Sequence, residues 1–263
     1  MKYIDHLSKR GADFLHPGSK KSTDFFIQEI LKRNPNSVLE LGCGTGASLV
    51  SLASNNINNL TGIDINPCQV EMAKKRIQYC GLKDSIQIYL SSNSEKLPFE
   101  DNSLDVAFAE SVLGILEHHH LIYLMSEVKR ILKPNGLFLS NDVIWKENVT
   151  FDVTEKINQR TLRNFGLIQS SGHLIGSKNW SSFFNSAGFK LVKIFDVDIL
   201  PETNIDALNF LETKSKEFTN KHKQKSLFNL SQIYHEISYK FKELGFNKNE
   251  VINLENKIFV MNS

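Results

Sequence analysis

The sequence predicts an α/β fold in which a doubly wound, mostly parallel sheet is covered by helices on both faces. Short apolar runs alternate with segments of helical period from residue 36 to about residue 143, and Gly, Pro or Asn marks most of the changes. Strands that alternate with helices of this length are expected to be parallel, because each crossover helix buries its apolar stripe against the sheet.

The first 90 residues supply a helical opening and three strands. Apolar residues repeat at helical spacing over Phe25–Leu31, and Pro35 breaks the chain after them. Asn66 places a capping side chain before Pro67, which suits a first helical position, and Gly81 is a typical helix stop. The predicted strands are 37–41, 60–64 and 85–90, and the helices between them are 47–53 and 67–81.

The second half continues the alternation and then departs from it. The helix over 121–132 ends before Pro134, and a further helix covers 180–187. The last two strands are expected to form a hairpin-like pair, which adds an antiparallel edge strand and completes a sheet of seven. The predicted strands here are 104–109, 136–143, 189–195 and 257–261.

We expect one domain over residues 1–263, because α/β folds of this length often form a single unit. It divides into an N-terminal helical segment (1–35), a ligand-binding core (36–145) and two helical insertions (146–179 and 200–250) that interrupt the regular rhythm. Ligands bind such sheets at the carboxyl ends of the strands. The insertions are therefore predicted to form a lid over that edge.

Composition excludes several classes of protein. Hydrophobic residues make up 41% of the chain, which is too many for a disordered or collagen-like sequence. No apolar run approaches the roughly 18 residues that cross a bilayer, and Asp5, Arg10 and Asp13 interrupt the start where a signal peptide would be apolar. We therefore expect a cytoplasmic protein without membrane insertion. The net charge of +2 implies no basic field for nucleic acid.

Neither the cysteines nor the histidines predict a metal site. Cys43, Cys68 and Cys80 form no C-x-x-C pair, and an odd number of cysteines indicates reduced thiols rather than a disulfide framework. Residues 118–120 are three successive histidines. Successive helical residues point about 100° apart, so these three rings are not expected to converge on one ion.

A glycine-rich turn carries the chemistry. Residues 40–46 read Glu-Leu-Gly-Cys-Gly-Thr-Gly and lie between a predicted strand and a predicted helix, where backbone N–H groups and the helix N-terminus approach a ligand closely. With Asp64 after the next strand, the pattern also fits a dinucleotide fingerprint. Glu40 favours another ligand, because a carboxylate there suits a cationic amino or sulfonium group better than a pyrophosphate.

Four motifs in order resemble those of class I S-adenosylmethionine-dependent methyltransferases, and the nearest branch is that of ubiquinone-biosynthesis-type and arsenite-type small-molecule enzymes. The motifs cover residues 38–46, 62–67, 94–105 and 132–136. The resemblance implies a Rossmann-like fold and transfer of a methyl group from S-adenosylmethionine, leaving S-adenosylhomocysteine. Cys68 and Cys80 fall on the helix after the second strand, away from the substrate side, so arsenic chemistry is not expected.

The resemblance also implies a set of cofactor contacts. Glu40 would face the methionyl amino group, the glycine turn would wrap the methionyl and ribose parts, and Asp64 would bind the ribose hydroxyls. Asn93 stands where the family often has Asp, and its amide oxygen can still accept a hydrogen bond. The implied cofactor-binding residues are Glu40, Gly42, Cys43, Gly44, Gly46, Asp64, Ile65, Asn93, Ser94 and Glu110. Alternatively, Asp64 caps a helix, Cys43 only packs and Glu110 is a surface acid.

Methyl transfer from a sulfonium is a direct in-line displacement, so positioning in a dry pocket is the main contribution expected of the protein. A general base is needed only for a protonated acceptor, and the candidates are Glu110, His118, Asp142 and His173, each of which also suits a pocket-lining or capping role.

We predict a small organic acceptor and a monomer or homodimer. Two alternatives stay open: an RNA (tRNA) methyltransferase that uses the basic C-terminal segment Lys214–Lys225, and a non-catalytic protein that binds an adenosine cofactor.

Overall fold

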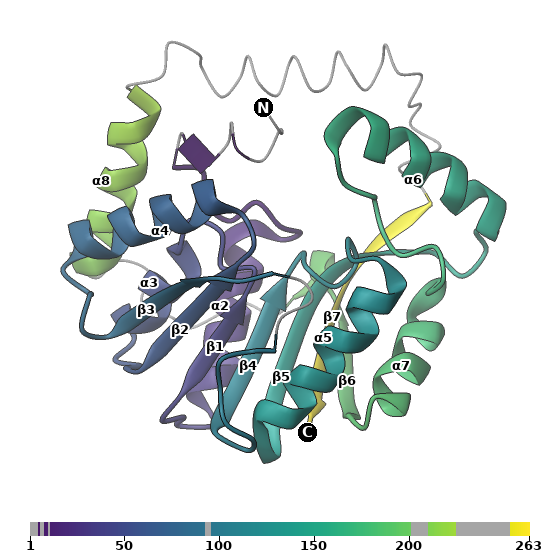
Figure 1. Ribbon diagram of the computed structural model, residues 1–263, viewed down its shortest axis with the longest axis horizontal. Coiled ribbons are helices and arrows are strands. Elements are labelled where there is room, and N and C mark those ends of the chain that lie inside the picture. Colours follow the sequence, from purple (N-terminus) through teal and green to yellow (C-terminus); the bar gives the residue numbers. More distant parts are fainter. Residues whose placement is uncertain (1–4, 6–7, 10, 93–95, 201–209, 225–252) are drawn as a thin grey trace.

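The computed structural model of the 263-residue chain describes residues 5, 8–9, 11–92, 96–200, 210–224 and 253–263. These residues contain a seven-stranded sheet with the strand order β3-β2-β1-β4-β5-β7-β6 (Figure 1). Strand β7 pairs antiparallel with both of its neighbours, and all other pairs are parallel. The strands are β1 (Val38–Leu41), β2 (Leu60–Asp64), β3 (Ile86–Leu90), β4 (Leu104–Glu110), β5 (Leu132–Trp145), β6 (Lys190–Asp196) and β7 (Leu254–Asn262).

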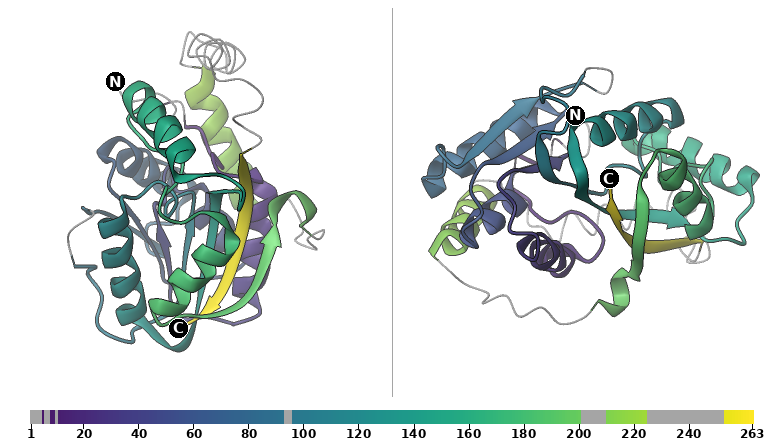
Figure 2. Two further views of the ribbon diagram at one scale, coloured as in Figure 1. Left: turned by 90° about the vertical axis from the view of Figure 1, so that its right-hand side faces the viewer. Right: turned by 90° about the horizontal axis from the view of Figure 1, so that it is seen from below.

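Helices cover both faces of the sheet, as Figure 2 shows from two further sides. Residues of α2, α3 and α4 share one hydrophobic core with one face, and residues of α5 and α7 share a second core with the other. The helices are α2 (Ser19–Leu31), α3 (Ala47–Ser54), α4 (Pro67–Cys80), α5 (His118–Ile131), α6 (Phe151–Phe165), α7 (Gly176–Ser186) and α8 (Phe210–Gln224), with a short 3₁₀ helix, η1 (Val197–Ile199).

The predicted fold class is confirmed, and the structure adds where the antiparallel strand lies. The last two strands form the predicted antiparallel pair, but β7 lies on the inner side, between β5 and the edge strand β6. Residues 257–261 of β7 include Ile258, Phe259, Val260 and Met261, all buried. This apolar run suits a strand that is covered on both faces, which explains its inner position.

Strand periodicity decides which side chains reach which face. In β1, Val38 packs in the core with α2–α4, whereas Leu39 and Leu41 pack in the core with α5 and α7. Because side chains alternate along a strand, Glu40 lies on the same face as Val38. In β4, the same alternation places Glu110 on the face of Phe108, which belongs to the core with α2–α4. Two acids thus share one face at the carboxyl ends of adjacent strands.

A fully buried arginine joins three segments that are distant in sequence. The Arg76 guanidinium, on α4, donates to the backbone oxygen of Thr45 in the glycine turn at 2.9 Å and to the Gly11 oxygen at 3.1 Å. It also donates to the Ser215 hydroxyl on α8 at 2.7 Å, and Phe218 packs over it. These bonds compensate the cost of burying the charge. Arg76 therefore fixes the N-terminal segment and α8 against the glycine turn.

The two insertions lie in different places. Helix α6 falls within residues 146–179 and stands above the carboxyl ends of the strands (Figure 1). Helix α8, the described part of the 200–250 insertion, packs against α3 and α4 instead. The remainder of that insertion, including the basic residue Lys225, lies outside the described residues. In the part of the chain that is described, no helix combines the length and the apolar character needed to cross a membrane.

Candidate active site

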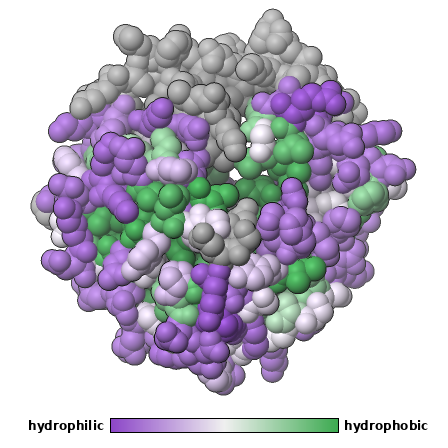
Figure 3. Space-filling view, viewed as in Figure 1, coloured by the Kyte–Doolittle hydropathy of each residue, from purple (hydrophilic) through white to green (hydrophobic). Residues whose placement is uncertain are grey.

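A cavity of about 780 Å³ opens at the carboxyl edge of the sheet. This volume lies within the usual range of roughly 300–1,000 Å³ for ligand pockets. Its wall combines the glycine turn after β1, the end of β2, the end of β4 with the turn after it, one side of α5 and residues that follow α6. Residues 12–16 of the N-terminal segment close one side. Figure 3 shows a hollowed apolar band across this side of the molecule.

The glycine turn has a backbone that other residues rarely adopt. Gly42 and Gly44 both have positive φ, 67° and 53°, and the N–H groups of Gly42 and Cys43 donate to the Ile63 oxygen on β2. A Cβ on Gly42 would overlap the Val112 side chain, whereas a Cβ on Gly44 would meet no atom within 4 Å. Gly44 therefore borders open space, as a residue that faces a ligand would. Gly46 does not line the cavity, and its missing side chain admits Ala73 of α4.

These contacts predict different defects for two glycine-to-alanine variants. Gly42→Ala combines backbone strain of about 1–2 kcal/mol with a clash against the Val112 side chain of about 1–3 kcal/mol, so we expect a loss of folding stability. Gly44→Ala carries only the backbone strain, and its methyl group points into the cavity. We expect it to weaken cofactor binding while costing less folding stability than Gly42→Ala. Equal losses of stability in both variants, by urea denaturation, would contradict this account.

Asp64 joins the glycine turn to the start of α4. Its carboxylate accepts the Gly44 N–H at 2.9 Å and the Asn66 N–H at 2.8 Å, and it is buried at the end of β2. Burial raises the pKa of Asp64, and the N–H groups of Asn66 and Gly44 oppose that shift. The role of helix cap falls to Asn66, whose side chain accepts from the Cys68 N–H. Asp64 is thus left free to meet a ligand beside the glycine turn.

Glu40 is a buried acid without enough partners. One of its carboxylate oxygens, Oε2, has no hydrogen-bond partner, although it is almost inaccessible to solvent. Burial raises the pKa of Glu40 well above its ordinary value, and the nearby Glu110 raises it further. A buried carboxylate with an unpaired oxygen is costly. Since Glu40 lines the cavity, a cationic group bound there would supply the missing partner.

Glu110 stands in a polar network that includes the N-terminal segment. The Thr23 hydroxyl donates to it at 2.9 Å, and His16 Nδ1 lies 3.3 Å from its Oε1. Since Thr23 gives its only proton to Glu110, His16 Nε2 must donate to Thr23, 3.2 Å away. His16 Nδ1 also faces the Pro17 oxygen, so both ring nitrogens meet acceptors. Burial raises the pKa of Glu110, and the positive charge of His16 opposes that shift.

His16 was missed by the sequence reasoning. It lies among residues without a clear period, and its partners Thr23 and Glu110 are 7 and 94 residues away, so no local spacing indicates the contact. The segment that carries it is held by the Asn141 amide, which donates to the Pro17 oxygen at 2.8 Å. Asn141 of β5 lies beside Glu110 in the sheet. A lone histidine of this kind becomes visible only when the strand order is known.

The remaining predicted cofactor contacts fall into three groups. Ile65 lines the cavity and is 54% exposed, as an apolar residue that meets a ligand would be. Cys43 also lines the cavity, but its thiol is buried and burial raises its pKa, which suits packing better than reactivity. Asn93 and Ser94 lie outside the described residues, so their predicted contact with the cofactor stays a prediction.

Three candidate bases do not line this cavity. His118 and His173 contact each other with ring centroids 4.9 Å apart, and Phe151 and Phe183 pack against this pair. Asp142 is fully buried and accepts the Gly114 N–H at 2.9 Å and the hydroxyl of Ser140. It therefore supports the turn after β4, whose residues 111, 112, 115 and 116 line the cavity. Positioning this turn is the role that its contacts indicate.

Asp142 predicts a pH dependence of folding stability. Burial raises its pKa from 3.8 to about 7, despite the hydrogen bonds from Ser140 and the backbone. In that window the folded protein holds a proton that the unfolded chain has released, so the stability from this group is lost as pH rises from about 4 to about 7. Asp142→Asn keeps the acceptor for Gly114 and cannot ionise. In urea unfolding at pH 5 and pH 8, the variant should lose less stability than the wild type; parallel losses would contradict this.

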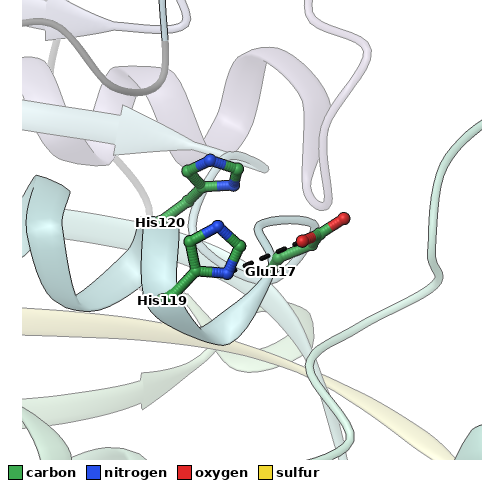
Figure 4. Close-up of side chains that lie close together, drawn as sticks. All are labelled: Glu117, His119 and His120. Carbon is green, nitrogen blue, oxygen red and sulfur yellow. Dashed lines mark ion pairs between the residues drawn. The ribbon is translucent and has the colours of Figure 1, made fainter.

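The three successive histidines do not act together. His118 turns toward His173, whereas the rings of His119 and His120 lie 3.9 Å apart, beside Glu117 (Figure 4). Glu117, His119 and His120 hold ligand atoms within 4.8 Å of one another, and His119 pairs with Glu117 at 3.6 Å. The side chains of Glu117 and His119 are exposed, and the group lies on the first turn of α5, where the helix dipole disfavours a cation. Its exposure and its position at the start of the helix do not favour a bound metal ion at this group.

Comparison with known proteins agrees with the resemblance found in the sequence. A family described as a methyltransferase domain matches residues 39–140. An uncharacterised protein of Haemophilus influenzae is 31% identical over 189 residues, which are 72% of each chain. Sterol 4-C-methyltransferase strm-1 of Caenorhabditis elegans is 33% identical over 145 residues, 55% of this chain and 42% of that enzyme, so this match spans less than half of the sterol enzyme.

A solved structure shares the fold along almost the whole chain. It is that of a Galdieria sulphuraria protein assigned as a sarcosine dimethylglycine methyltransferase. The alignment covers 98% of this chain and 97% of that one, with a TM-score of 0.69 and 16% identity. The likeness in fold therefore extends well beyond residues 39–140.

Proposed function

Since the chain belongs to the class I S-adenosylmethionine-dependent methyltransferases, we propose that it methylates a small organic molecule by direct in-line displacement. S-adenosylmethionine is the cofactor of this family and S-adenosylhomocysteine is its product. When bound, the cofactor supplies an electrophilic methyl group on a positively charged sulfur. The observation that carries the proposal is Glu40, a buried carboxylate that lines the cavity with one unpartnered oxygen.

The residues of the cavity fit this cofactor. An amino group beside Glu40 would satisfy its orphaned oxygen, and the open space above Gly44 admits a ligand against the backbone. Asp64 presents a carboxylate for hydroxyl groups, and the exposed Ile65 offers an apolar surface for a base. A dinucleotide fits less well, because its pyrophosphate would meet the acids Glu40 and Glu110.

The chain's own residues hold and orient the reactants and exclude water. The N-terminal segment closes one wall of the cavity through Ala12, whose oxygen accepts from the Thr45 hydroxyl at 2.8 Å, and through His16 at Glu110. The turn held by Asp142 forms another wall. Positioning of this kind contributes several kcal/mol to a bimolecular reaction. Glu110, already paired with His16 and Thr23, is better suited to hold this geometry than to accept a proton.

A small acceptor is favoured over RNA. The basic residues Lys214, Lys216 and Lys221 lie on α8, which packs against α3 and α4 and contributes nothing to the cavity wall. A charge run on such a helix is usually a solvated face. The cytoplasmic location and the monomeric or homodimeric state stay predictions.

Two measurements test the proposal. In thermal unfolding, S-adenosylmethionine and S-adenosylhomocysteine should raise the unfolding temperature in proportion to their affinity, and NAD should not. In a metabolite extract, label from methyl-labelled S-adenosylmethionine should enter a small product only when the protein is present. Stabilisation by NAD alone would overturn the proposal. Binding of the cofactor without any labelled product would indicate a cofactor-binding protein without transferase activity. That result would also overturn the proposal.

A further inference from the structure

We infer that the methyl acceptor is an uncharged, largely hydrocarbon molecule that brings no carboxylate, phosphate or ammonium group into the cavity. The inference rests on the proposed function and adds the chemical class of the acceptor. It follows from the charges that line the cavity, from the partners that already hold those charges, and from the apolar side chains on the wall opposite the glycine turn.

The described residues of the cavity wall include no lysine and no arginine. Anionic acceptors are normally held by such side chains, above all by arginine. An anion buried here without a partner would cost several kcal/mol in desolvation alone, and the surrounding acids would add repulsion. The acids and histidines among the lining residues are Asp5, Asp13, Glu40, Asp64, Glu110, Glu127, His16 and His120.

Two arginines near the wall are already paired. The Arg76 guanidinium lies behind the glycine turn, where it binds the oxygens of Gly11 and Thr45. Arg130 is held by Glu127, Nη2 to Oε2 at 2.7 Å, and its other donors reach residues 97–101. Neither guanidinium can turn into the cavity without leaving a buried acid or carbonyl unpaired, which would itself be costly.

The acids of the wall are also engaged, which argues against a cationic acceptor. Glu110 pairs with His16, Glu127 with Arg130, and Asp13 accepts the Thr219 hydroxyl at 3.0 Å. Glu40 and Asp64 face the part of the cavity that the glycine turn forms, and the cofactor brings its own positive charge to them. A second cation in the same cavity would be repelled by that charge.

Several other segments of the wall contribute mostly apolar side chains. Helix α6 and the residues after it contribute Phe165 and Leu167, and the turn after β4 contributes Val112 and Ile115. Among the polar residues that line the cavity, Gln169 is the nearest in sequence to Phe165 and Leu167. Figure 3 shows an apolar band on this side of the molecule. Burial of hydrocarbon against such side chains gives about 25 cal/mol for each Å² removed from water, which can hold an acceptor without any ion pair.

The charge of the labelled product tests the inference, whichever molecule accepts the methyl group. Product from the extract reaction is partitioned between water and an organic solvent at pH 2, 7 and 11. We expect the label to enter the organic phase equally at all three values. Label held in water at pH 7 and 11 but not at pH 2 indicates a carboxylic acid, label held at pH 2 and 7 but not at pH 11 indicates an amine, and label held at all three values indicates a fixed charge; each result overturns the inference.

A methyl ester would enter the organic phase although its acceptor was charged, and a second treatment identifies this case. Methylation of a carboxylate yields a neutral ester, so the extracted product is treated with alkali. Label released as methanol would reveal an anionic acceptor and overturn the inference. If no label is transferred although S-adenosylhomocysteine binds, the proposed function fails; if label is transferred into a charged product, only the present inference fails.

A charge placed in the apolar wall provides a binding test that needs no turnover. Calorimetry with S-adenosylhomocysteine present compares 1-decanol, decanoate and decylammonium. The wild type should bind 1-decanol at least tenfold more tightly than either ion, and Gln169→Arg should shift the preference toward decanoate. Gln169→Met is the uncharged control, and S-adenosylhomocysteine binding shows that each variant is folded. Decanoate or decylammonium binding as tightly as 1-decanol to the wild type would contradict the inference.

Discussion

Replacing Glu40 by glutamine is expected to weaken S-adenosylmethionine binding about 10- to 100-fold while stabilising the free protein. A hydrogen bond to a charged group contributes about 1.5–3 kcal/mol, and each 1.4 kcal/mol is a factor of ten in affinity. Without the cofactor, the carboxylate is buried with Oε2 unpartnered and with Glu110 close by. Glutamine removes that charge. The free protein then no longer contains the destabilising buried carboxylate that the cofactor would neutralise.

The pH dependence separates this explanation from a loss of packing. Burial raises the folded-state pKa of Glu40 above 4.5, so its ionisation destabilises the free protein as pH rises above that value. The wild type should lose stability over this range, and Glu40→Gln should lose less. Calorimetry gives the affinity and urea unfolding the stability. Glu29→Gln, which breaks an ion pair with Lys32 on α2, is the control; it should leave the affinity unchanged and alter the stability by no more than about 1 kcal/mol. Lower stability of Glu40→Gln at every pH would contradict the account.

Replacing Asp64 by asparagine should affect both the glycine turn and the cofactor. The carboxylate accepts N–H groups from Gly44 and Asn66 on its two oxygens, and an amide can keep only one of these bonds. Its NH₂ group would then face a backbone N–H, which leaves a buried donor unpaired at a cost of about 1–3 kcal/mol. With the contact to the ribose also lost, we expect cofactor affinity to fall about 100-fold or more.

A matched aspartate at the other edge of the sheet provides the control. Asp105, at the amino end of β4, also accepts backbone N–H groups, from Asn36 and Ser37, and pairs with Lys133. Asp105→Asn should lower the stability because the ion pair with Lys133 is lost, and should leave the cofactor affinity unchanged. If both variants lose affinity in proportion to their stability, Asp64 has only a structural role.

Local patterns predicted those features whose cause is local. The alternation of strands and helices, the glycine turn and the cap at Asn66 each depend on residues within one or two turns of chain, and the structure contains all three. Glu40 was predicted to face the ligand from its place before the turn, and it lines the cavity. What the sequence could not supply was the partner of each buried charge.

Long-range partners explain the residues that were missed or placed differently. His16 meets Glu110 across 94 positions, and Arg76 meets Ser215 across 139, so no periodic pattern connects them. Asp142 was a candidate base, but strand alternation turns it toward Gly114, behind the cavity wall. The place of β7 inside the sheet also depends on a choice of neighbours that two short apolar runs do not encode.

The position of β7 has a consequence for synthesis on the ribosome. Strand β6 pairs with β7 alone, and β7 also supplies the outer partner of β5. Until residues 254–262 emerge from the ribosome, one edge of β5 is unpaired and β6 has no strand to pair with. Unpaired strand edges invite aggregation. About sixty residues must be synthesised after β6 before β7 can pair with both β5 and β6. This protein should therefore depend on chaperones more heavily than a protein whose strands pair in chain order.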